Sequence, residues 1–415
     1  MRKIFHMHWS KLPTRQIKER VFSALDKNLN YRKESILGLP ASYLDQEQFY
    51  FDAPFLKDAA YLSVLIHNPN HIGCHTYQKG ESYFSGTHEL EIDLIRICAE
   101  EIFGAPKNGY DGYVAPGGTE ANIEAQWIFR NYFQKEYQAK PSEIGLIFSE
   151  DVHYSAYKGC NLLGITPITV KVDNSRKWDL SDAEQKISEA QKAGIKYLII
   201  HLTMGTTMFG SVDSSNEITA LVRQKGLRYF VHVDAAFGGF IYPFTSGDTD
   251  LTFANPEISS ITIDGHKMLQ APYGTGIFLC RKGLIEYAKT AEASYVQGTD
   301  FTLCGSRSGA NAIAVWMILM THGSDGWKYL MQRLVDRTDQ ICERLDEIGI
   351  AYYRHPVMNI VTMKAENFPL NVAKKYHLVA DNFDNPKWWK IVVMPHVEKH
   401  LIDEFLIDLH QSRVK

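Results

Sequence analysis

The middle of the chain carries short apolar runs, each bounded by residues typical of turns. Runs of this length are expected to form strands that are buried on both faces. They are GLIFSED (145–151), PITVKV (167–172), YLIIHL (197–202), YFVHVD (229–234), SSITID (259–264) and GIFLCR (276–281). Helical segments such as SDAEQKISEAQKAG (181–194) and SNEITALVRQKG (215–226) separate several of them. Strands that alternate with helices predict an α/β fold with a mainly parallel central sheet and helices on both faces.

Two changes of pattern divide the chain into three predicted parts. The stretch up to about residue 75 is rich in aromatic residues and turn signals. From residue 311 a long helical stretch leads into two apolar runs, RHPVMNIVTMKA and KWWKIVVMPHV, and a final helix, LIDEFLIDLH. We therefore predict an N-terminal segment (1–75), a large domain (76–310) and a smaller C-terminal α+β domain (311–415). In the large domain, Thr87 is the expected N-cap of the helix THELEIDLIRICAEEIF.

Composition narrows the class of protein. The 44 Lys and Arg and 48 Asp and Glu give a net charge of −4 in short runs of mixed sign, which does not suggest a nucleic-acid partner. The start of the chain, MRKIFHMHWSKLP, lacks the apolar core of a signal peptide, and no apolar run is long enough to span a membrane. The six cysteines lack C-x-x-C spacing, so we expect reduced thiols in a cytoplasmic protein.

The histidines offer an alternative that involves a metal. His6 with His8, or His71 with His75, would be the paired ligands. Neither pair has a carboxylate or cysteine partner at motif spacing, so we expect no metal site.

Two residues at strand ends suggest a reactive centre. Ligands of open α/β sheets bind at the carboxyl ends of the strands, where Asp234 ends one apolar run and Lys267 follows another. A lysine that reacts with a carbonyl must first lose its proton, and the adjacent His266 is compatible with that. A carboxylate at Asp234 would pair with a pyridinium nitrogen and keep it protonated. Taken alone, a lysine after a strand is usually a surface residue and a strand-end aspartate is often a helix cap.

The segment APGGTEANIEAQWIFR (115–130) provides a candidate phosphate site. Its Gly-Gly-Thr turn opens a helix, and free N–H groups and the helix dipole at such a turn attract phosphate. Thr119 can add a hydroxyl donor. Glycine pairs before helices are common, but neither a G-x-G-x-x-G nor a G-x-x-x-x-G-K-[ST] motif occurs, which argues against dinucleotides and nucleoside triphosphates.

Two further loops follow predicted strands. His153, in SEDVHYSAYKG, can stack on a planar ring, although a lone loop histidine is more often structural. Thr206 and Thr207, in HLTMGTTMFGSVD, can reach a cofactor oxygen.

Taken together and in this order, these motifs resemble those of the fold-type I pyridoxal 5′-phosphate (PLP) enzymes, specifically the group II amino-acid decarboxylases. The matching motifs are GGTEAN (117–122), HYS (153–155), GTTMFGSVD (205–213), HVDAA (232–236) and HK (266–267). The spans HVDAAFGGF and CGSRSGA (304–310) are most similar to archaeal tyrosine/aspartate decarboxylases. ILGLPAS (36–42) is similar to a segment of histidine and serine decarboxylases. The resemblance implies decarboxylation of an L-amino acid to the amine and carbon dioxide.

The resemblance also implies a role for each matching residue near the ring. Lys267 would carry PLP as a Schiff base, and Asp234 would bind the pyridine nitrogen. His153 would stack on one face of the ring and Ala236 would pack on the other. Thr206 would lie near the ring hydroxyl or the substrate carboxylate.

The remaining implied roles concern the phosphate and a second subunit. Gly118, Thr119 and His266 would bind the phosphate, and Ser306 would reach it from the other subunit of a homodimer with shared active sites. Tyr295, in AEASYVQGTDFTLCGSRSG, would reach across the dimer and protonate the substrate carbon after carbon dioxide leaves. The alternative is a loop aromatic that packs on the surface.

The amino-acid substrate stays open at this point. The APGGT lead-in and the long region IHNPNHIGCHTYQKGESYFSGTHELE (66–91) depart from the pattern of the archaeal enzymes. His75, Tyr77 and Lys79 are candidates to line the substrate pocket.

Two other functions compete with this interpretation. A carbon–carbon lyase resembling sphingosine-phosphate lyase would share the His-Val-Asp and Gly-Ser-Arg features, but HVDAA and the lack of an apolar span favour decarboxylation. A non-catalytic scaffold with the same fold would not need Lys267, Asp234 and His153 together.

Overall fold

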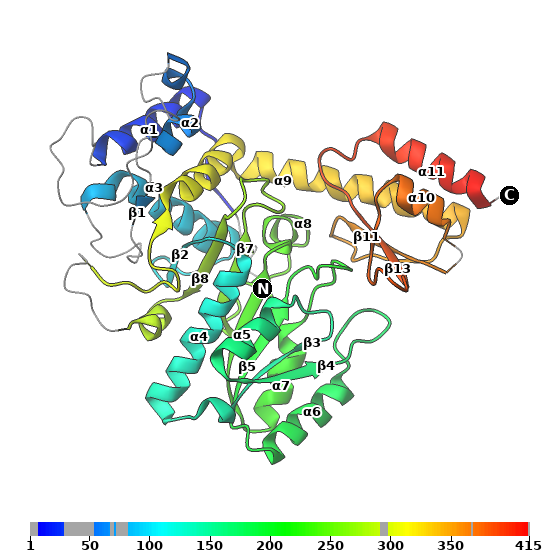
Figure 1. Ribbon diagram of the computed structural model, residues 1–415, viewed down its shortest axis with the longest axis horizontal. Coiled ribbons are helices and arrows are strands. Elements are labelled where there is room, and N and C mark those ends of the chain that lie inside the picture. The colour runs from blue at the N-terminus through cyan, green and yellow to red at the C-terminus, as the bar shows by residue number, and fades with distance from the viewer. Residues whose placement is uncertain are drawn as a thin grey trace.

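The computed structural model describes residues 7–28, 54–66, 70–71, 82–290, 298–366 and 368–413. Figure 1 shows a large part built around a central sheet, N-terminal helices packed beside it, and a small C-terminal part reached along the long helix α9 (Gly309–Ile348). ILGLPAS, His6, Tyr295 and the stretch 75–79 lie outside the described residues.

The central sheet has seven strands in the order β2-β8-β7-β6-β5-β3-β4. They are β2 (Tyr110–Ala115), β3 (Ile144–Ser149), β4 (Thr166–Val170), β5 (Tyr197–Thr203), β6 (Arg228–Ala235), β7 (Ile258–Asp264) and β8 (Gly276–Arg281). Strands β7, β6, β5, β3 and β4 pair in parallel, whereas β8 runs antiparallel to β7 and β2. The six predicted apolar runs form β3 to β8, which confirms the mainly parallel α/β sheet.

Helices surround this sheet and precede it. They are α1 (Thr14–Lys27), α2 (Ala60–Ile66), α3 (Ser85–Arg96), α4 (Gly118–Tyr137), α5 (Ser155–Leu163), α6 (Leu180–Lys192), α7 (Ser215–Gln224) and α8 (Tyr242–Thr245). A π-helical turn (Ile97–Ile102) extends α3, and short 3-10 turns occupy Pro54–Lys57, Ser82–Phe84, Pro141–Glu143, Gly238–Phe240 and Leu284–Ala288. A short antiparallel pair joins β1 (Asn70–His71) to β9 (Arg307–Ser308).

Each face of the central sheet has its own core. On β3, Leu146 and Phe148 pack in the core under α4 and α5, while Ile147 packs in the core on the opposite face, against α3, α6, α7 and α9. Because both faces are buried, successive strand positions are equally apolar, which explains the continuous runs in the sequence.

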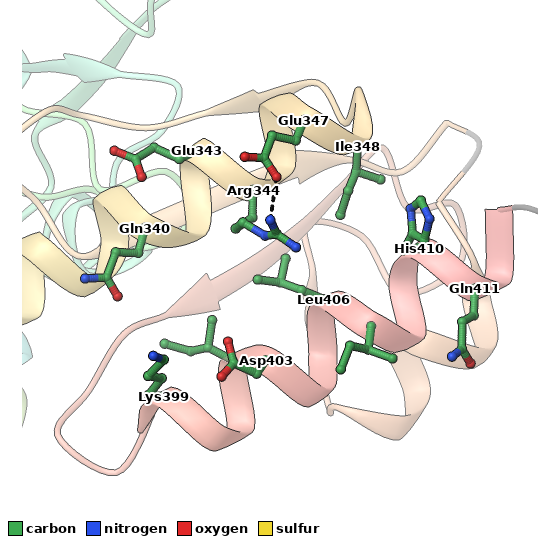
Figure 2. Close-up of a pocket in the computed structure, with 12 residues that line it drawn as sticks. Gln340, Glu343, Arg344, Glu347, Ile348, Lys399, Asp403, Leu406, His410 and Gln411 are labelled. Carbon is green, nitrogen blue, oxygen red and sulfur yellow. Dashed lines mark hydrogen bonds and ion pairs between the residues drawn. The ribbon is translucent and has the colours of Figure 1, made fainter.

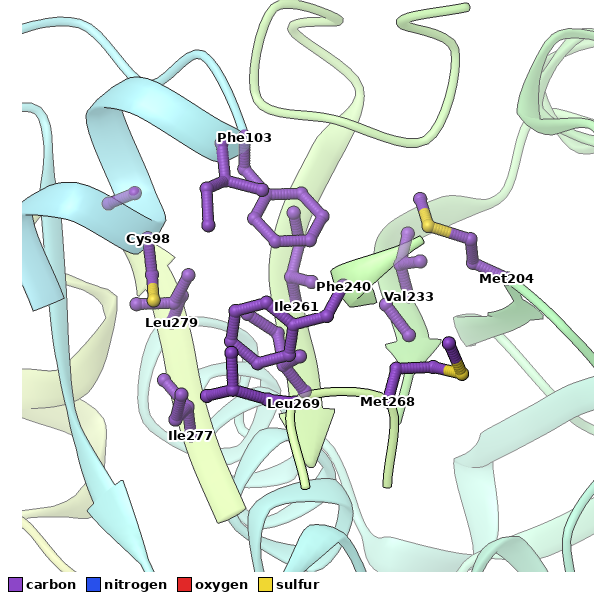
Figure 3. Packing of buried hydrophobic residues seen from close by; sticks show 14 of the residues in the cluster. Cys98, Phe103, Met204, Val233, Phe240, Ile261, Met268, Leu269, Ile277 and Leu279 are labelled. Atoms are coloured by element: carbon purple, nitrogen blue, oxygen red, sulfur yellow. The ribbon is translucent and has the colours of Figure 1, made fainter. Parts of the chain in front are cut away.

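The second of these cores anchors the loop that follows β7. Figure 3 shows Met268 and Leu269 lying among residues of this core, close to the strands that carry Val233 and Ile261. Both loop side chains are fully buried. The loop is closed by Gly265 N–H donating to the Thr275 carbonyl and by Ala271 N–H donating to the Gly265 carbonyl. Lys267 therefore lies on a fixed turn rather than on a free surface loop.

The predicted N-cap at Thr87 is wrong. Helix α3 begins at Ser85, and the Thr87 hydroxyl donates to the Phe84 carbonyl. The first N–H groups of the helix are capped from another element, because Asn28 Oδ1 accepts from the N–H groups of Gly86 and Thr87 at 2.9 and 3.4 Å. Such a tertiary cap leaves no local signal in the sequence.

The C-terminal part has a small antiparallel sheet with the order β10-β11-β13-β12 and its own core. Its elements are β10 (Tyr352–Tyr353), β11 (Ile360–Lys364), α10 (Leu370–Lys375), β12 (Val379–Ala380), β13 (Trp388–Val392) and α11 (Lys399–Arg413). Helix α9 bends at Gly323 and contributes its N-terminal half to the large core and Ile341, Cys342 and Leu345 to the small one. Within the described ranges, no helix has both the length and the apolarity needed to cross a bilayer.

Candidate functional site

A cavity of about 410 Å³ opens where the carboxyl ends of β6 and β7 face the start of α4. Its lining includes seven residues that the sequence singled out: Gly118, Thr119, His153, Asp234, Ala236, His266 and Lys267. They come from four separate segments of the chain, so the fold brings together motifs that lie far apart in the sequence.

Two of the other predicted residues do not line this cavity in the described chain. Thr206 is buried in the turn after β5, where its hydroxyl lies 2.7 Å from the Ser211 hydroxyl. Ser306 is exposed in the loop before β9.

Asp234 ends β6 with its carboxylate held by fixed donors. Asn122 Nδ2 donates to Oδ2 at 2.8 Å, and the Ala236 N–H donates to Oδ1 at 3.0 Å. Burial alone would raise the pKa of Asp234, but the nearby His201 and Lys267 and the Ala236 N–H outweigh it and hold the pKa well below its usual value. This side chain is therefore a buried, permanent carboxylate facing the cavity.

A chain of hydrogen bonds behind Asp234 fixes the orientation of His153. Asn122 Oδ1 lies 2.9 Å from His232 Nε2, and Asn122 Nδ2 also donates to the Ser155 hydroxyl at 3.0 Å. The Ser155 hydroxyl lies 2.9 Å from His153 Nδ1. The Ser155 backbone N–H donates to His153 Nδ1 at 3.3 Å, so Nδ1 is an acceptor and the Ser155 hydroxyl donates to it as well. Burial lowers the pKa of His153, so the ring is a neutral, flat surface at the cavity.

Asn122 and His232 are functional residues that the sequence analysis did not assign. Both stand inside quoted motifs, GGTEAN and HVDAA, and this was the available signal. Burial lowers the pKa of His232 strongly, so it is neutral and can act as the Nε2–H donor to Asn122.

The start of α4 forms the opposite wall. Gly118 begins the helix, and no side chain caps it. A Cβ at Gly118 would lie 2.8 Å from Asp264 Oδ2, so any other residue here would require the Asp264 carboxylate to move. The N–H groups of this first turn and the positive end of the helix dipole make it suitable for an anion.

Lys267 and His266 complete the cavity next to Asp264. Lys267 Nζ lies 3.3 Å and His266 Nε2 3.7 Å from Asp264 Oδ2. Within the described residues, Asp264 Oδ1 and His266 Nδ1 are buried without a hydrogen-bond partner. The site thus contains the amine of Lys267, the flat imidazole of His153 and the buried carboxylate of Asp234. The first turn of α4 and His266 form a site that can bind a phosphate. Together these groups fit a phosphorylated pyridine aldehyde.

A larger cavity of about 720 Å³ lies between α9 and α11 and has a different character (Figure 2). Figure 2 shows Arg344 paired with Glu347 at its edge, at 2.6 Å, beside the apolar Ile348 and Leu406. None of the residues singled out in the sequence lines it. Seven of the residues singled out in the sequence therefore line the β6–β7 cavity, and none lines this one.

Comparison with known proteins agrees with the geometry. Residues 70–352 match the family described as the pyridoxal-dependent decarboxylase conserved domain. The chain is 46% identical to a tryptophan decarboxylase of Clostridium sporogenes, over 97% of both chains. The crystal structure of Oryza sativa TDC with PLP and tryptamine superposes with a TM-score of 0.71 at 13% identity, covering 96% of both chains.

The fold itself does not distinguish amino-acid decarboxylases from sphingosine-1-phosphate lyases. The sphingosine-1-phosphate lyase of Burkholderia pseudomallei superposes with a TM-score of 0.70 at 16% identity, covering 97% of this chain and 90% of its own. At such identities the likeness concerns the fold alone. The family match and the sequence relative decide the reaction, which is the loss of carbon dioxide from an amino acid.

Proposed function

This chain belongs to the pyridoxal-dependent decarboxylase family, and from that premise we propose that its substrate is L-tryptophan, converted to tryptamine and carbon dioxide. Its activity as a PLP-dependent amino-acid decarboxylase is given by the family and its relatives. The observation that carries the tryptophan proposal is the 46% identity to the Clostridium sporogenes tryptophan decarboxylase over 97% of both chains.

We propose roles for the residues around the ring. When bound, PLP supplies an electron sink that accepts the electron pair left when carbon dioxide departs. Lys267 holds the cofactor covalently, and the carboxylate of Asp234 keeps a proton on the pyridine nitrogen. His153 covers one face of the ring, and Ala236 covers the other.

The phosphate and the proton donor involve further residues. Gly118, Thr119 and His266 hold the phosphate, and Ser306 contributes from a second subunit. Loss of carbon dioxide from an amino acid consumes one proton at Cα, and Tyr295 supplies it. The location of the first three around one cavity supports this proposal.

The proposed assembly is a homodimer with shared active sites. Tyr273 lines the cavity and stacks near His266, with ring centroids 4.5 Å apart, yet it is 88% exposed. A second subunit that covered the mouth of the cavity would bury this ring. We further propose that the chain consists of an N-terminal segment (1–75), a large domain (76–310) and a small C-terminal domain (311–415). We also propose a cytoplasmic location, which the free thiols of Cys160 and Cys342 support.

The substrate proposal is tested with a panel of amino acids. Purified PLP-loaded protein is given L-tryptophan, L-phenylalanine, L-tyrosine, L-histidine or L-aspartate, and carbon dioxide release is measured at several concentrations. We expect kcat/KM for tryptophan to exceed the others by about tenfold or more, since one favourable pocket contact is worth about 1.4 kcal/mol or more. A higher value for tyrosine or aspartate would overturn the tryptophan assignment and leave the decarboxylase activity intact.

A further inference from the structure

Asp264, at the end of β7, is a buried carboxylate that none of the roles above uses. Its side chain is 5% exposed, and Oδ2 lies 3.3 Å from Lys267 Nζ. His266 Nε2 is 3.7 Å from the same oxygen. Asp264 is thus the counter-ion of the lysine amine in the cofactor-free protein.

The same carboxylate lies against the proposed phosphate site. A Cβ at Gly118 would lie 2.8 Å from Oδ2 and 3.0 Å from Oδ1, so both oxygens touch the first turn of α4. Oδ1 is buried and has no hydrogen-bond partner among the described residues. The Asp264 carboxylate therefore lies at the proposed phosphate site, where the phosphate of the cofactor would bind.

Two anions in this position repel each other. A phosphomonoester carries nearly two negative charges above neutral pH. A like charge nearby favours the neutral form of a carboxyl group. The groups facing Asp264 are Lys267 and His266 from its own loop, Asp234 from β6 and His153 from the loop after β3.

We propose that Asp264 is a positioning residue that holds the amine of Lys267 in the free protein and takes up one proton when the cofactor phosphate enters the cradle. In this step the proton comes from solvent and binds to the carboxylate, no other bond changes, and the repulsion is removed. The inference rests on the proposed phosphate site at Gly118, Thr119 and His266.

The environment of Asp264 is already suited to this step. Burial raises its pKa, the charges of Lys267 and His266 oppose the rise, and Asp234 adds to it, so the pKa lies above that of a free aspartate. Asp234, in contrast, is held as a carboxylate by its donors. The two acids of the cavity are therefore driven toward opposite protonation states, as expected where they have different tasks.

The test compares wild type with Asp264→Asn, which keeps the shape and can still accept a hydrogen bond from Lys267. The exposed Asp58→Asn serves as a charge-matched control. Calorimetric titration of the apoprotein at pH 8 in two buffers of different ionisation enthalpy gives the protons taken up on binding PLP or pyridoxal, which lacks the phosphate.

We expect the number of protons taken up on binding PLP to be higher for wild type and Asp58→Asn than for Asp264→Asn. The expected difference is a large part of one proton per site. With pyridoxal the difference should vanish. Asp264→Asn should also bind PLP about tenfold more tightly at pH 8, because the variant does not have to take up a proton before the phosphate enters. Equal proton uptake by wild type and Asp264→Asn, or weaker PLP binding by the variant, would overturn the proposal.

The test still works if the Asp264→Asn variant fails to fold, and it does not depend on the tryptophan proposal. If Asp264→Asn does not fold, equal proton uptake by wild type with PLP and with pyridoxal would still overturn the inference, because at pH 8 the free phosphate is already fully ionised. None of these readouts needs a substrate, so failure of the tryptophan proposal would leave them unchanged.

Discussion

At the scale of single residues, a substitution of Asp234 tests whether its carboxylate is needed for the reaction or only for the structure. Asp234→Asn removes the charge and keeps a single oxygen, which can accept from the Ala236 N–H or from Asn122 but not from both. We expect PLP to stay bound while kcat/KM for amine formation falls by about 100-fold or more, since a preorganised charge of this kind contributes about 3 kcal/mol. Steady-state assays of holoprotein, with exposed Asp384→Asn as the control, measure this. Near-normal turnover would show that the carboxylate is only a cap.

Glu120 predicts a pH dependence of stability. Burial raises its pKa to about 7, although Tyr113 donates to its carboxylate at 3.0 Å and Arg307 is close enough to oppose the rise. The folded state therefore binds the proton more tightly than the unfolded state, in which the pKa is about 4.3. Stability from this group is present at low pH and is lost as the pH rises from about 4 through 7.

The substitution Glu120→Gln should remove the loss of stability that accompanies ionisation of Glu120 at high pH. We expect the variant to match wild type near pH 4 and to be more stable near pH 8 by at most roughly 4 kcal/mol, from the pKa difference. Chemical unfolding at both pH values measures it, with exposed Glu343→Gln as the control. A variant less stable than wild type at pH 8 would mean that Glu120 is ionised and favourably paired in the native state.

At the scale of elements, the bend in α9 depends on one glycine. Gly323 has a φ of 65° inside the helix, and a Cβ there would lie 2.7 Å from the Lys11 backbone nitrogen. The N-terminal segment is held at this bend, because the Ser324 N–H donates to the Trp9 carbonyl and the Leu12 N–H to the Met320 carbonyl. The bend therefore fastens the start of the chain to the large core.

Gly323→Ala should destabilise the protein by about 2 kcal/mol or more, from the left-handed backbone and the displaced segment. Gly326→Ala, three residues along the same helix, is the matched control, because the nearest atom to its Cβ would be 3.7 Å away. That change should raise stability by up to about 1 kcal/mol through helix propensity. Equal unfolding midpoints for the two variants would contradict the importance of the bend.

The elements that the sequence predicted share a physical property. Strands buried on both faces must be apolar throughout, so β3 to β8 could be found as runs. Strand β2, YDGYVA, escaped because it carries Asp111, whose buried carboxylate accepts from Lys282 Nζ at 2.9 Å and from the Gly283 N–H at 2.7 Å. Both partners lie in the turn that follows β8, far along the chain, so no local pattern indicates this pairing.

The sequence predicted those site residues that stand in a recognisable motif. It did not predict the residues whose role depends on contacts between distant parts of the chain. Lys267, Asp234 and Gly118 could be proposed from strand ends and a Gly-Gly-Thr turn. The bond between Asn122 and His232 joins two elements that only the folded sheet brings together. Asp264 ends the run SSITID, as Asp234 ends YFVHVD, but its closeness to Lys267 and Gly118 appears only in the folded chain.

At the scale of the whole molecule, shared active sites predict complementation between two damaged subunits. Lys267→Ala and Tyr295→Phe should each form little amine as homodimers. If Tyr295 reaches the partner's site, a purified hybrid carrying one of each chain has one intact site and should recover about half of the wild-type rate. Two affinity tags isolate the hybrid. A rate no higher than the mean of the parents would show that each site is built from a single chain.

The central claim is that one lysine, in one cavity, holds the cofactor. Borohydride reduction of the purified holoprotein, followed by proteolysis and mass spectrometry, tests it most directly, because reduction fixes the cofactor permanently to whichever amine carries it. We predict a single pyridoxyl modification, on the peptide that contains Lys267, and none in Lys267→Ala. A modification on Lys390, Lys158 or any other lysine, with Lys267 unmodified, would contradict the account.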